Sequence, residues 1–226
     1  MGGTVVTRGA RLVVLGKQGA GKGTQCVRLS HYLAIPHIST GDMLRAAVKD
    51  GTEFGRLARE YMDRGELIPD DVIMGIVEDR IAEPDASRGF VLDGFPRTTV
   101  QAKALDEMVK PKAIDLVLDL DVPTELVLKR LSSRRVCSTC GANYSLEAPP
   151  KVNWTCDICG GEVVQRPDDT VSVIRRRLDL YEESTAPLLE FYSDRNLLAR
   201  VDGVGTPDEV MERLVEVVDR VRAESN

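Results

Sequence analysis

The sequence predicts an α/β fold in which a parallel sheet is covered by helices. Short apolar runs recur along the 226 residues and alternate with stretches of helical periodicity. A glycine-rich loop joins the first apolar run to the first helical stretch, which gives the order strand, loop, helix. A hydrophobic content of 42% is enough for a sizeable core.

The expected strands are five short apolar runs. Helical stretches or insertions separate each run from the next, and this alternation favours parallel pairing. In chain order the runs cover residues 11–16, 35–38, 89–93, 114–120 and 197–201.

Two helices have clear signals. Within residues 54–62 apolar side chains recur at every third or fourth position, and Gly65 can end the helix that this spacing predicts. Near the carboxyl end, Thr206 and Glu209 predict a capping box with Pro207 at the first helical position. We interpret this last helix as purely structural.

The pattern changes from about residue 137 to 169. Cysteine pairs, two consecutive prolines, two consecutive glycines and a single tryptophan replace the helical periodicity. We therefore expect an insertion with its own internal organisation.

Composition excludes several classes of function. A formal net charge of −6 and a pI near 5.1 argue against a nucleic-acid-binding surface, which needs clustered positive charge. Residues 1–10 contain one arginine and no long apolar stretch, and no run of about 18 apolar residues occurs anywhere. The sequence predicts a cytoplasmic protein with no nucleic-acid or membrane partner.

Residues 16–24, with the sequence GKQGAGKGT, are typical of a phosphate-binding loop. Glycines let the backbone turn sharply and bring its N–H groups to a phosphate, and the following helix adds the positive end of its dipole. Magnesium-binding loops of the general pattern have Ser or Thr directly after the lysine, whereas the hydroxyl here comes one residue later. The predicted nucleotide contacts are Gly19, Ala20, Gly21, Lys22, Gly23 and Thr24.

Asp93 ends an apolar run and precedes a glycine, which places it at the carboxyl edge of the sheet, where open α/β sheets bind ligands. We expect it to orient Mg²⁺ through water. Lys17, inside the loop, either adds charge beside the phosphates or points to solvent, and we favour solvent.

Four of the five cysteines form two C-x-x-C pairs separated by 15 residues. This spacing is typical of two knuckles that hold one structural Zn²⁺ through four thiolates, Cys137, Cys140, Cys156 and Cys159. Redox-active C-x-x-C pairs are the alternative, but the thioredoxin-like setting is missing. We interpret Cys26 as a small buried side chain and both histidines, His31 and His37, as structural.

Three motifs together resemble the adenylate kinases: GxxxxGKGT in the loop, STGDMLR at 39–45 and DGFPRT at 93–98. The likeness extends from residue 11 to about 216. It implies a three-layer P-loop fold with a five-stranded parallel sheet, formed as one kinase unit from residues 1–226. The core would comprise 1–38, 69–132 and 170–226, with an AMP-binding insertion at 39–68 and a zinc-stapled lid at 133–169.

The resemblance also implies the reaction: reversible phosphoryl transfer from MgATP to AMP, giving two ADP, in a monomer that maintains adenine nucleotide levels. Arginine suits such a site because its planar fork can bind a phosphate through two hydrogen bonds. By the resemblance, the AMP contacts are Thr40, Arg45, Glu66, Leu67, Ile68, Gly94, Arg97, Gln101, Arg166 and Arg177. The ATP side adds Arg130, Arg134, Asn143, Tyr144 and Gly205, and catalysis is assigned to Lys22, Asp93, Arg97, Arg130, Arg134, Arg166 and Arg177.

Other interpretations stay open. GTP could replace ATP as the donor, because backbone near Asn143–Tyr144 and at residues 203–205 would select the base. A zinc-ribbon nucleic-acid-binding protein with a regulatory nucleotide site is a second possibility, and a nucleotide-gated switch without transfer activity is a third. Arg135, Arg175 and Arg176 are expected to face solvent.

Overall fold

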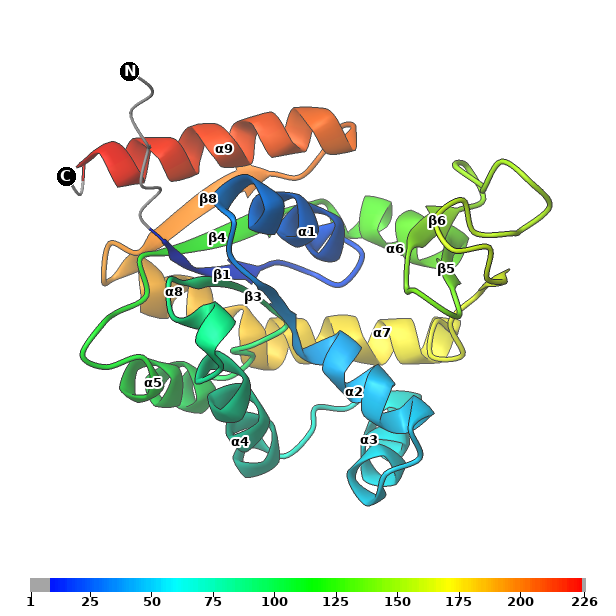
Figure 1. Cartoon of the computed structure of the whole chain (residues 1–226), viewed down its shortest axis with the longest axis horizontal. Helices are drawn as coiled ribbons and strands as arrows, with labels where there is room; N and C mark the ends of the chain where they lie inside the picture. Colours follow the sequence, from blue (N-terminus) through cyan, green and yellow to red (C-terminus); the bar gives the residue numbers. More distant parts are fainter. Residues whose placement is uncertain (1–8, 225–226) are drawn as a thin grey trace.

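A computed structural model describes residues 9–224. The centre of the fold is a parallel sheet in the order β2-β3-β1-β4-β8 (Figure 1). This confirms the predicted five-stranded α/β fold. The strands are β1 (Arg11–Leu15), β2 (His37–Ser39), β3 (Phe90–Asp93), β4 (Leu116–Asp121) and β8 (Leu198–Asp202).

Helices cover both faces of this sheet, which produces three layers. One layer is formed by α1 and α9, and the other by helices that include α4, α5 and α8 (Figure 1). The α-helices are α1 (Lys22–Leu33), α2 (Thr40–Lys49), α3 (Glu53–Arg64), α4 (Asp70–Ile81), α5 (Thr99–Met108), α6 (Thr124–Ser133), α7 (Val171–Leu180), α8 (Pro187–Ser193) and α9 (Pro207–Glu224). A 3-10 turn (Pro84–Ala86) and a π-helical turn, η2 (Tyr181–Thr185), complete the helical elements of the described residues.

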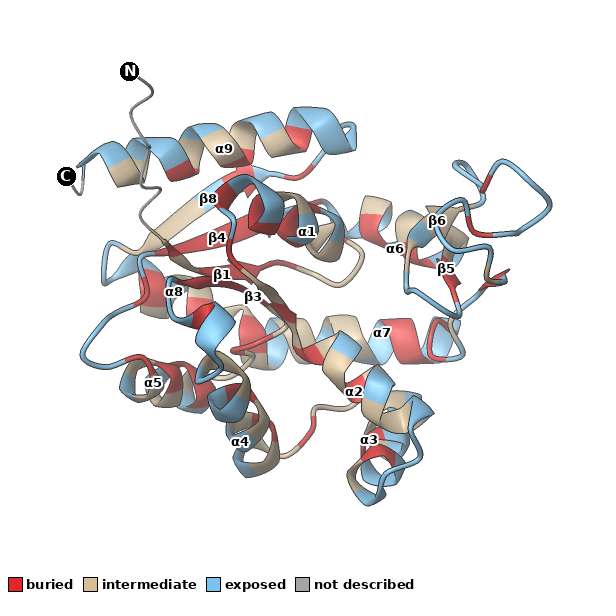
Figure 2. Cartoon of the chain, in the orientation of Figure 1, coloured by how far each residue is buried: buried red, intermediate tan, exposed pale blue. Residues whose placement is uncertain are grey.

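The core lies on both sides of the sheet because successive residues of a strand point to opposite faces. In β1, Leu12 and Val14 belong to the cluster beneath α1 and α9, whereas Val13 and Leu15 belong to the opposite cluster. Figure 2 shows the central strands as the most continuously buried part of the chain. A parallel sheet buried in this way fixes the ends of its strands, and the site is built there.

The predicted helix ends are confirmed by their caps. Gly65 adopts a left-handed conformation with φ of 70° directly after α3, and its N–H donates to the carbonyl of Met62. At the start of α9 the N–H of Thr206 donates to Oε2 of Glu209 over 2.7 Å, and the N–H of Glu209 donates back to Oγ1 of Thr206 over 3.3 Å. These reciprocal bonds form the capping box that the sequence predicts.

Two parts project from the three-layer body. Helices α2 and α3 pack against each other, and a small antiparallel sheet in the order β6-β5-β7 lies farther out (Figure 1). Its strands are β5 (Arg134–Cys137), β6 (Asn143–Ser145) and β7 (Val163–Val164). Its buried centre is small, since it consists of Cys137, Cys156 and Val163 with Ala142 and Tyr144 packed against them.

Candidate active site

The glycine-rich loop connects the end of β1 to the start of α1, as predicted. At Gly16, with φ of +131°, a Cβ atom would lie 2.6 Å from the carbonyl oxygen of Leu120, so only glycine fits there. The ammonium group of Lys22 folds back into the loop and donates to the carbonyls of Gly16 (2.6 Å) and Lys17 (2.9 Å). Burial lowers the pKa of Lys22, while the charge of Asp93 opposes that shift. The loop thus holds a partly desolvated cation.

Lys17 does not point to solvent, and that expectation was wrong. Its Nζ donates to Oγ1 of Thr124 over 2.8 Å and lies 3.4 Å from Oε1 of Glu182, so the side chain is only 22% exposed. The phosphate loop is therefore tied to the start of α6 and to η2.

Asp93 lies at the carboxyl end of β3, beside the loop. The parallel register pairs it with Val14 of β1, and its Oδ2 would lie 3.5 Å from a Cβ at Gly23. Its side chain is 13% exposed. A carboxylate is the kind of hard oxygen donor that Mg²⁺ prefers, so the residue fits a role in holding MgATP.

Arginines from distant parts of the chain gather around this edge of the sheet. Burial and the charges of Arg177 and Arg45 together lower the pKa of Arg97 to about 10, although the charge of Asp93 opposes the shift. Burial, together with repulsion from Arg45 and Arg134, likewise lowers the pKa of Arg166 to about 10. All of these groups stay charged at neutral pH. Such mutual repulsion in a half-buried site is relieved by a multiply charged anion.

Two buried aspartates hold two arginines of the site in place, and the sequence interpretation gave them no role. Asp169 accepts two hydrogen bonds from the guanidinium of Arg134, and Asp168 pairs with Arg177. Their side chains are 0% and 8% exposed. The signal that could have revealed them is two adjacent acidic residues directly after Arg166–Pro167, in a segment with many arginines.

Arg166 and Arg130 differ from the paired arginines. The Nε of Arg166 is buried and finds no hydrogen-bond partner within residues 9–224. Arg130 donates to the carbonyl of Ala20 over 3.0 Å and to that of Gly203 over 3.2 Å. It therefore bridges the phosphate loop and the loop after β8.

Among the residues assigned to AMP, Thr40 directly follows β2, Gly94 and Arg97 follow β3, and Gln101 lies in the first turn of α5. Thr40, 1% exposed, donates to the carbonyl of Asp93 over 3.3 Å. Gln101 accepts from the backbone N–H of Arg97 and donates to Asp70, both over 2.7 Å. Gly94 accepts from Nε of Arg97 over 2.8 Å. These contacts fix the orientation of Arg97 before any substrate binds.

The other residues assigned to AMP and the arginines expected at the surface are placed as follows. Arg45 pairs with Asp42 one helical turn away. Glu66 and Leu67 are half-buried in the loop after α3, and Ile68 is buried. Arg175 and Arg176 are exposed as predicted, whereas Arg135 is half-buried and donates to the carbonyl of Arg134 over 2.7 Å.

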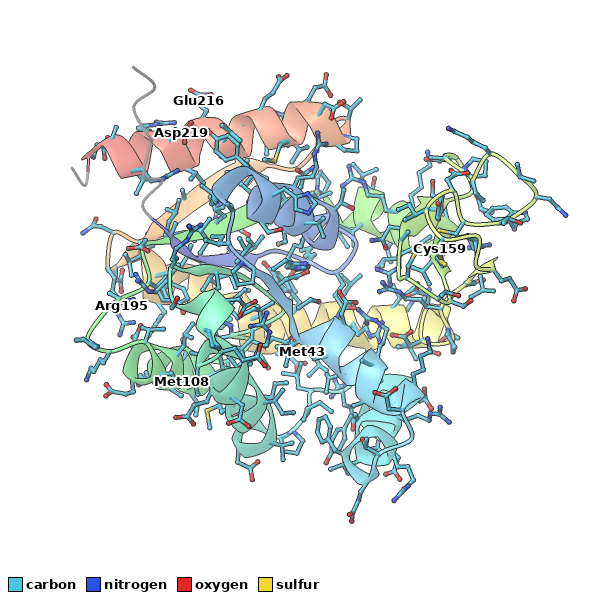
Figure 3. The ribbon with its side chains drawn as sticks, in the orientation of Figure 1. Met43, Met108, Cys159, Arg195, Glu216 and Asp219 are labelled. Carbon is cyan, nitrogen blue, oxygen red and sulfur yellow. The ribbon has the colours of Figure 1, made fainter. Side chains whose placement is uncertain are left out.

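The four clustered cysteines fit a structural zinc ion. Cys137 and Cys159 have their Sγ atoms 3.5 Å apart, and Cys140 and Cys156 have theirs 3.6 Å apart, close to the spacing of about 3.8 Å that Zn–S bonds of about 2.3 Å give in a tetrahedron. Backbone N–H groups donate to Sγ of Cys137 and Cys156, which stabilises thiolates. Figure 3 shows Cys159 within this outlying unit.

The residues expected near the base of ATP lie on β6 and in the loop before α9. Asn143 is exposed on β6, and the hydroxyl of Tyr144 donates to Sγ of Cys156 over 3.4 Å while accepting from the N–H of Asp157 over 2.8 Å. Gly205 is exposed in the loop before α9. The hydroxyl of Tyr144 is thus part of the cysteine knuckle. Its assigned contact with ATP stays a prediction, as do the other assigned roles.

The fold and this site define a P-loop phosphotransferase: a nucleotide-binding loop at the end of β1, a carboxylate at the end of β3 and a surrounding set of arginines. Comparison with known proteins identifies the family. The family model "Adenylate kinase" matches residues 14–197. Proteins named adenylate kinase are 49% identical in Archaeoglobus fulgidus and 48% identical in Thermodesulfovibrio yellowstonii, over 94% and 93% of this chain and 99% of each relative. One from Moorella thermoacetica is 51% identical over 85% of this chain and 90% of its own length. The chain belongs to the adenylate kinase family.

Proposed function

We propose that the residues gathered at the carboxyl edge of the sheet carry out the adenylate kinase reaction, in which MgATP and AMP give two ADP. Phosphoryl transfer needs little covalent help from a protein, so catalysis consists of positioning and charge stabilisation. The observation that supports this assignment is the convergence of six cations, which exceed the four carboxylates of Asp42, Asp93, Asp168 and Asp169 beside them. The cations are Lys22, Arg45, Arg97, Arg134, Arg166 and Arg177.

Each cation has a distinct place in the proposal. Lys22 would exchange its bonds to loop carbonyls for oxygens of the β and γ phosphates of ATP. Arg97, oriented by Gln101 and Gly94, would bind the phosphate of AMP together with Arg45. The unpartnered Nε of Arg166 would donate to the migrating group, where a preorganised donor is worth about 3 kcal/mol.

Mg²⁺ bound to ATP supplies charge neutralisation at the phosphates, and Asp93 would hold its hydration shell. Zn²⁺ in the four-cysteine cluster would give the small outlying sheet a fixed shape, because this sheet buries too few apolar side chains to be stable without the ion. Arg134 is the first residue of β5, so this unit and an arginine of the site are parts of one strand.

Residues 39–68 and 133–169 would be the two parts that close over AMP and ATP. Closure must exclude water, since water is a competing acceptor of the phosphoryl group. The remainder, 1–38, 69–132 and 170–226, would act as the fixed core. Among the described residues, no helix combines the length and apolar character that crossing a membrane requires. From the family we infer a monomer in the cytoplasm with nucleotides as its partners, and the net charge of −6 argues against a nucleic-acid partner.

The experiment compares two adjacent arginines of α7. Arg177→Lys keeps the charge but loses the planar fork, so we expect kcat to fall about 100-fold. Arg176→Lys is the matched control, because Arg176 is exposed. Product formation is followed by chromatography with ATP plus AMP and, separately, with GTP plus AMP. Equal activity of both variants would contradict the assigned role of Arg177, and faster product formation with GTP would make GTP the donor.

A further inference from the structure

A second group of metal-ligating side chains lies outside the four-cysteine cluster. Sγ of Cys26, a ring nitrogen of His37 and a carboxylate oxygen of Asp93 all lie within 4.8 Å of one another. Nε2 of His37 lies 3.6 Å from Oδ2 of Asp93. The three residues come from α1, β2 and β3, so each is positioned by a different element.

The packing of α1 on the sheet brings these residues together. In the parallel register of β2 and β3, Ser39 pairs with Asp93, so His37 lies two residues back on the neighbouring strand. Cys26 is one turn into α1 and fully buried, in the cluster that covers this face. The side chains are therefore held by regular secondary structure, which favours a defined ligand geometry.

His37 contributes a ring nitrogen that has no hydrogen-bond partner among the described residues. This atom, Nε2, is buried. The distance of 3.6 Å to Asp93 is too long for a hydrogen bond. An unpaired buried polar atom costs about 1–3 kcal/mol, and a bound cation would give it a partner.

We propose that Cys26, His37 and Asp93 form a second metal site, selective for a borderline or soft divalent cation such as Zn²⁺ or Co²⁺. One sulfur, one imidazole nitrogen and one carboxylate oxygen suit such cations and do not suit Mg²⁺ or Ca²⁺. Bonds of about 2.0–2.3 Å place tetrahedral donors about 3.3–3.8 Å apart. Side-chain shifts of about 1 Å would bring the three atoms to that spacing.

Three protein ligands leave a fourth position for water, which is the pattern of an open site rather than a closed structural one. The thiol of Cys26 releases its proton to solvent when the metal–sulfur bond forms. The charge of Lys22 acts on both Cys26 and Asp93 and opposes a cation there. We therefore expect weaker binding than at the four thiolates of the lid.

The site shares Asp93 with the proposed handling of MgATP, so occupation would inhibit phosphoryl transfer. This consequence rests on the proposed function, whereas metal binding itself does not. High Mg²⁺ or MgATP would oppose inhibition, because both would compete for the same carboxylate.

The first experiment titrates Co²⁺ into the full chain after its lid is loaded with one equivalent of Zn²⁺. Co²⁺ binds less tightly than Zn²⁺ to a given set of ligands, so the lid keeps its zinc, which elemental analysis verifies. We expect one equivalent of Co²⁺ with a thiolate-to-cobalt charge-transfer band. The band should vanish in Cys26→Ser, and the affinity should fall in His37→Asn. Absence of the band in the wild type, or an unchanged band in Cys26→Ser, would overturn the site.

His37→Asn also guards against a folding defect, because His37 is partly exposed and its replacement leaves the buried cluster around Cys26 intact. In a second assay, ADP formation by the zinc-lid enzyme is measured with added Zn²⁺ at low and high Mg²⁺. We expect inhibition that Mg²⁺ reverses in the wild type and weaker inhibition in His37→Asn. Cobalt binding without inhibition would leave the metal site standing and overturn the role of Asp93 in handling MgATP.

Discussion

Arg166→Met should make the substrate-free enzyme more stable and nearly inactive. The guanidinium of Arg166 is half-buried, and its Nε has no partner in residues 9–224. Its pKa of about 10 lies more than two below its ordinary value, because burial and the charges of Arg45 and Arg134 disfavour the cation. The charged form is thus less favourable in the folded chain than in the unfolded chain by about 3 kcal/mol.

We discount this figure to about 1–2 kcal/mol, because the side chain keeps some contact with water. A chain of this length gains roughly 2–4 °C in Tm for each kcal/mol, so Arg166→Met should unfold a few degrees above the wild type. The positive charge of Arg166 would instead stabilise the phosphoryl group during transfer, so its loss should lower kcat about 100- to 1000-fold.

The assay combines thermal unfolding, with and without ATP and AMP, and steady-state ADP formation. Nucleotide should raise the Tm of the wild type far more than that of Arg166→Met, because the variant lacks a phosphate ligand. Arg176→Met is the control for removing an exposed arginine, and it should change neither quantity. A substrate-free Tm below that of the wild type would show that Arg166 stabilises the fold, and this reasoning would be refuted.

Three further predictions concern the contacts that support the site. Lys17→Ala should raise KM for ATP about two- to fivefold with little change in kcat, because half-buried polar contacts are worth about 1 kcal/mol. Glu182→Gln should cause part of this rise in KM in the same kinetic assay. Burial opposes ionisation of Asp168, but the charge and hydrogen bond of Arg177 outweigh it and hold the pKa of Asp168 below its usual value. The resulting stability is present at neutral pH and is lost as the pH falls through that lowered value. The Tm difference between Asp168→Asn and the wild type should therefore begin to shrink below about pH 4 and keep shrinking as the pH falls further, and a difference that stays constant over this range would exclude the pair as its source. Cys156→Ser should lower the zinc content and speed amide hydrogen exchange in residues 134–164, while nucleotide still protects the phosphate loop from exchange. Equal loss of protection in residues 134–164 and in the phosphate loop would contradict a separate role for the zinc-binding segment.

Much of the fold follows from local sequence signals. Five apolar runs predict the strands to within two residues at each end, and capping signals at Gly65 and Thr206 define helix ends. These signals act over a few residues, so they can be recognised without knowledge of tertiary structure. The resemblance to a known family supplied the number of strands and their parallel direction, but the strand order β2-β3-β1-β4-β8 is seen only in the structure.

The parts of the site that sequence could not place depend on tertiary contacts. Lys17 meets Glu182, a residue of the π-helical turn η2, and periodicity gives no sign of that turn. Cys26, His37 and Asp93 are far apart in sequence and meet only through strand register and the packing of α1. The burial of Cys26 and the place of Asp93 at the edge of the sheet were expected from the sequence, whereas His37 was expected only to be structural. Only the structure shows that they share one location.

The central claim is that Lys22 and the surrounding arginines bind and stabilise the phosphoryl group that passes from ATP to AMP. The most direct measurement is ADP formation from MgATP and AMP by the wild type and by Lys22→Ala, with circular dichroism of both proteins to verify folding. We predict that the wild type forms two ADP for each AMP consumed, and that Lys22→Ala keeps its fold while its kcat falls about 1000-fold. A folded Lys22→Ala enzyme with activity near that of the wild type would contradict the claim.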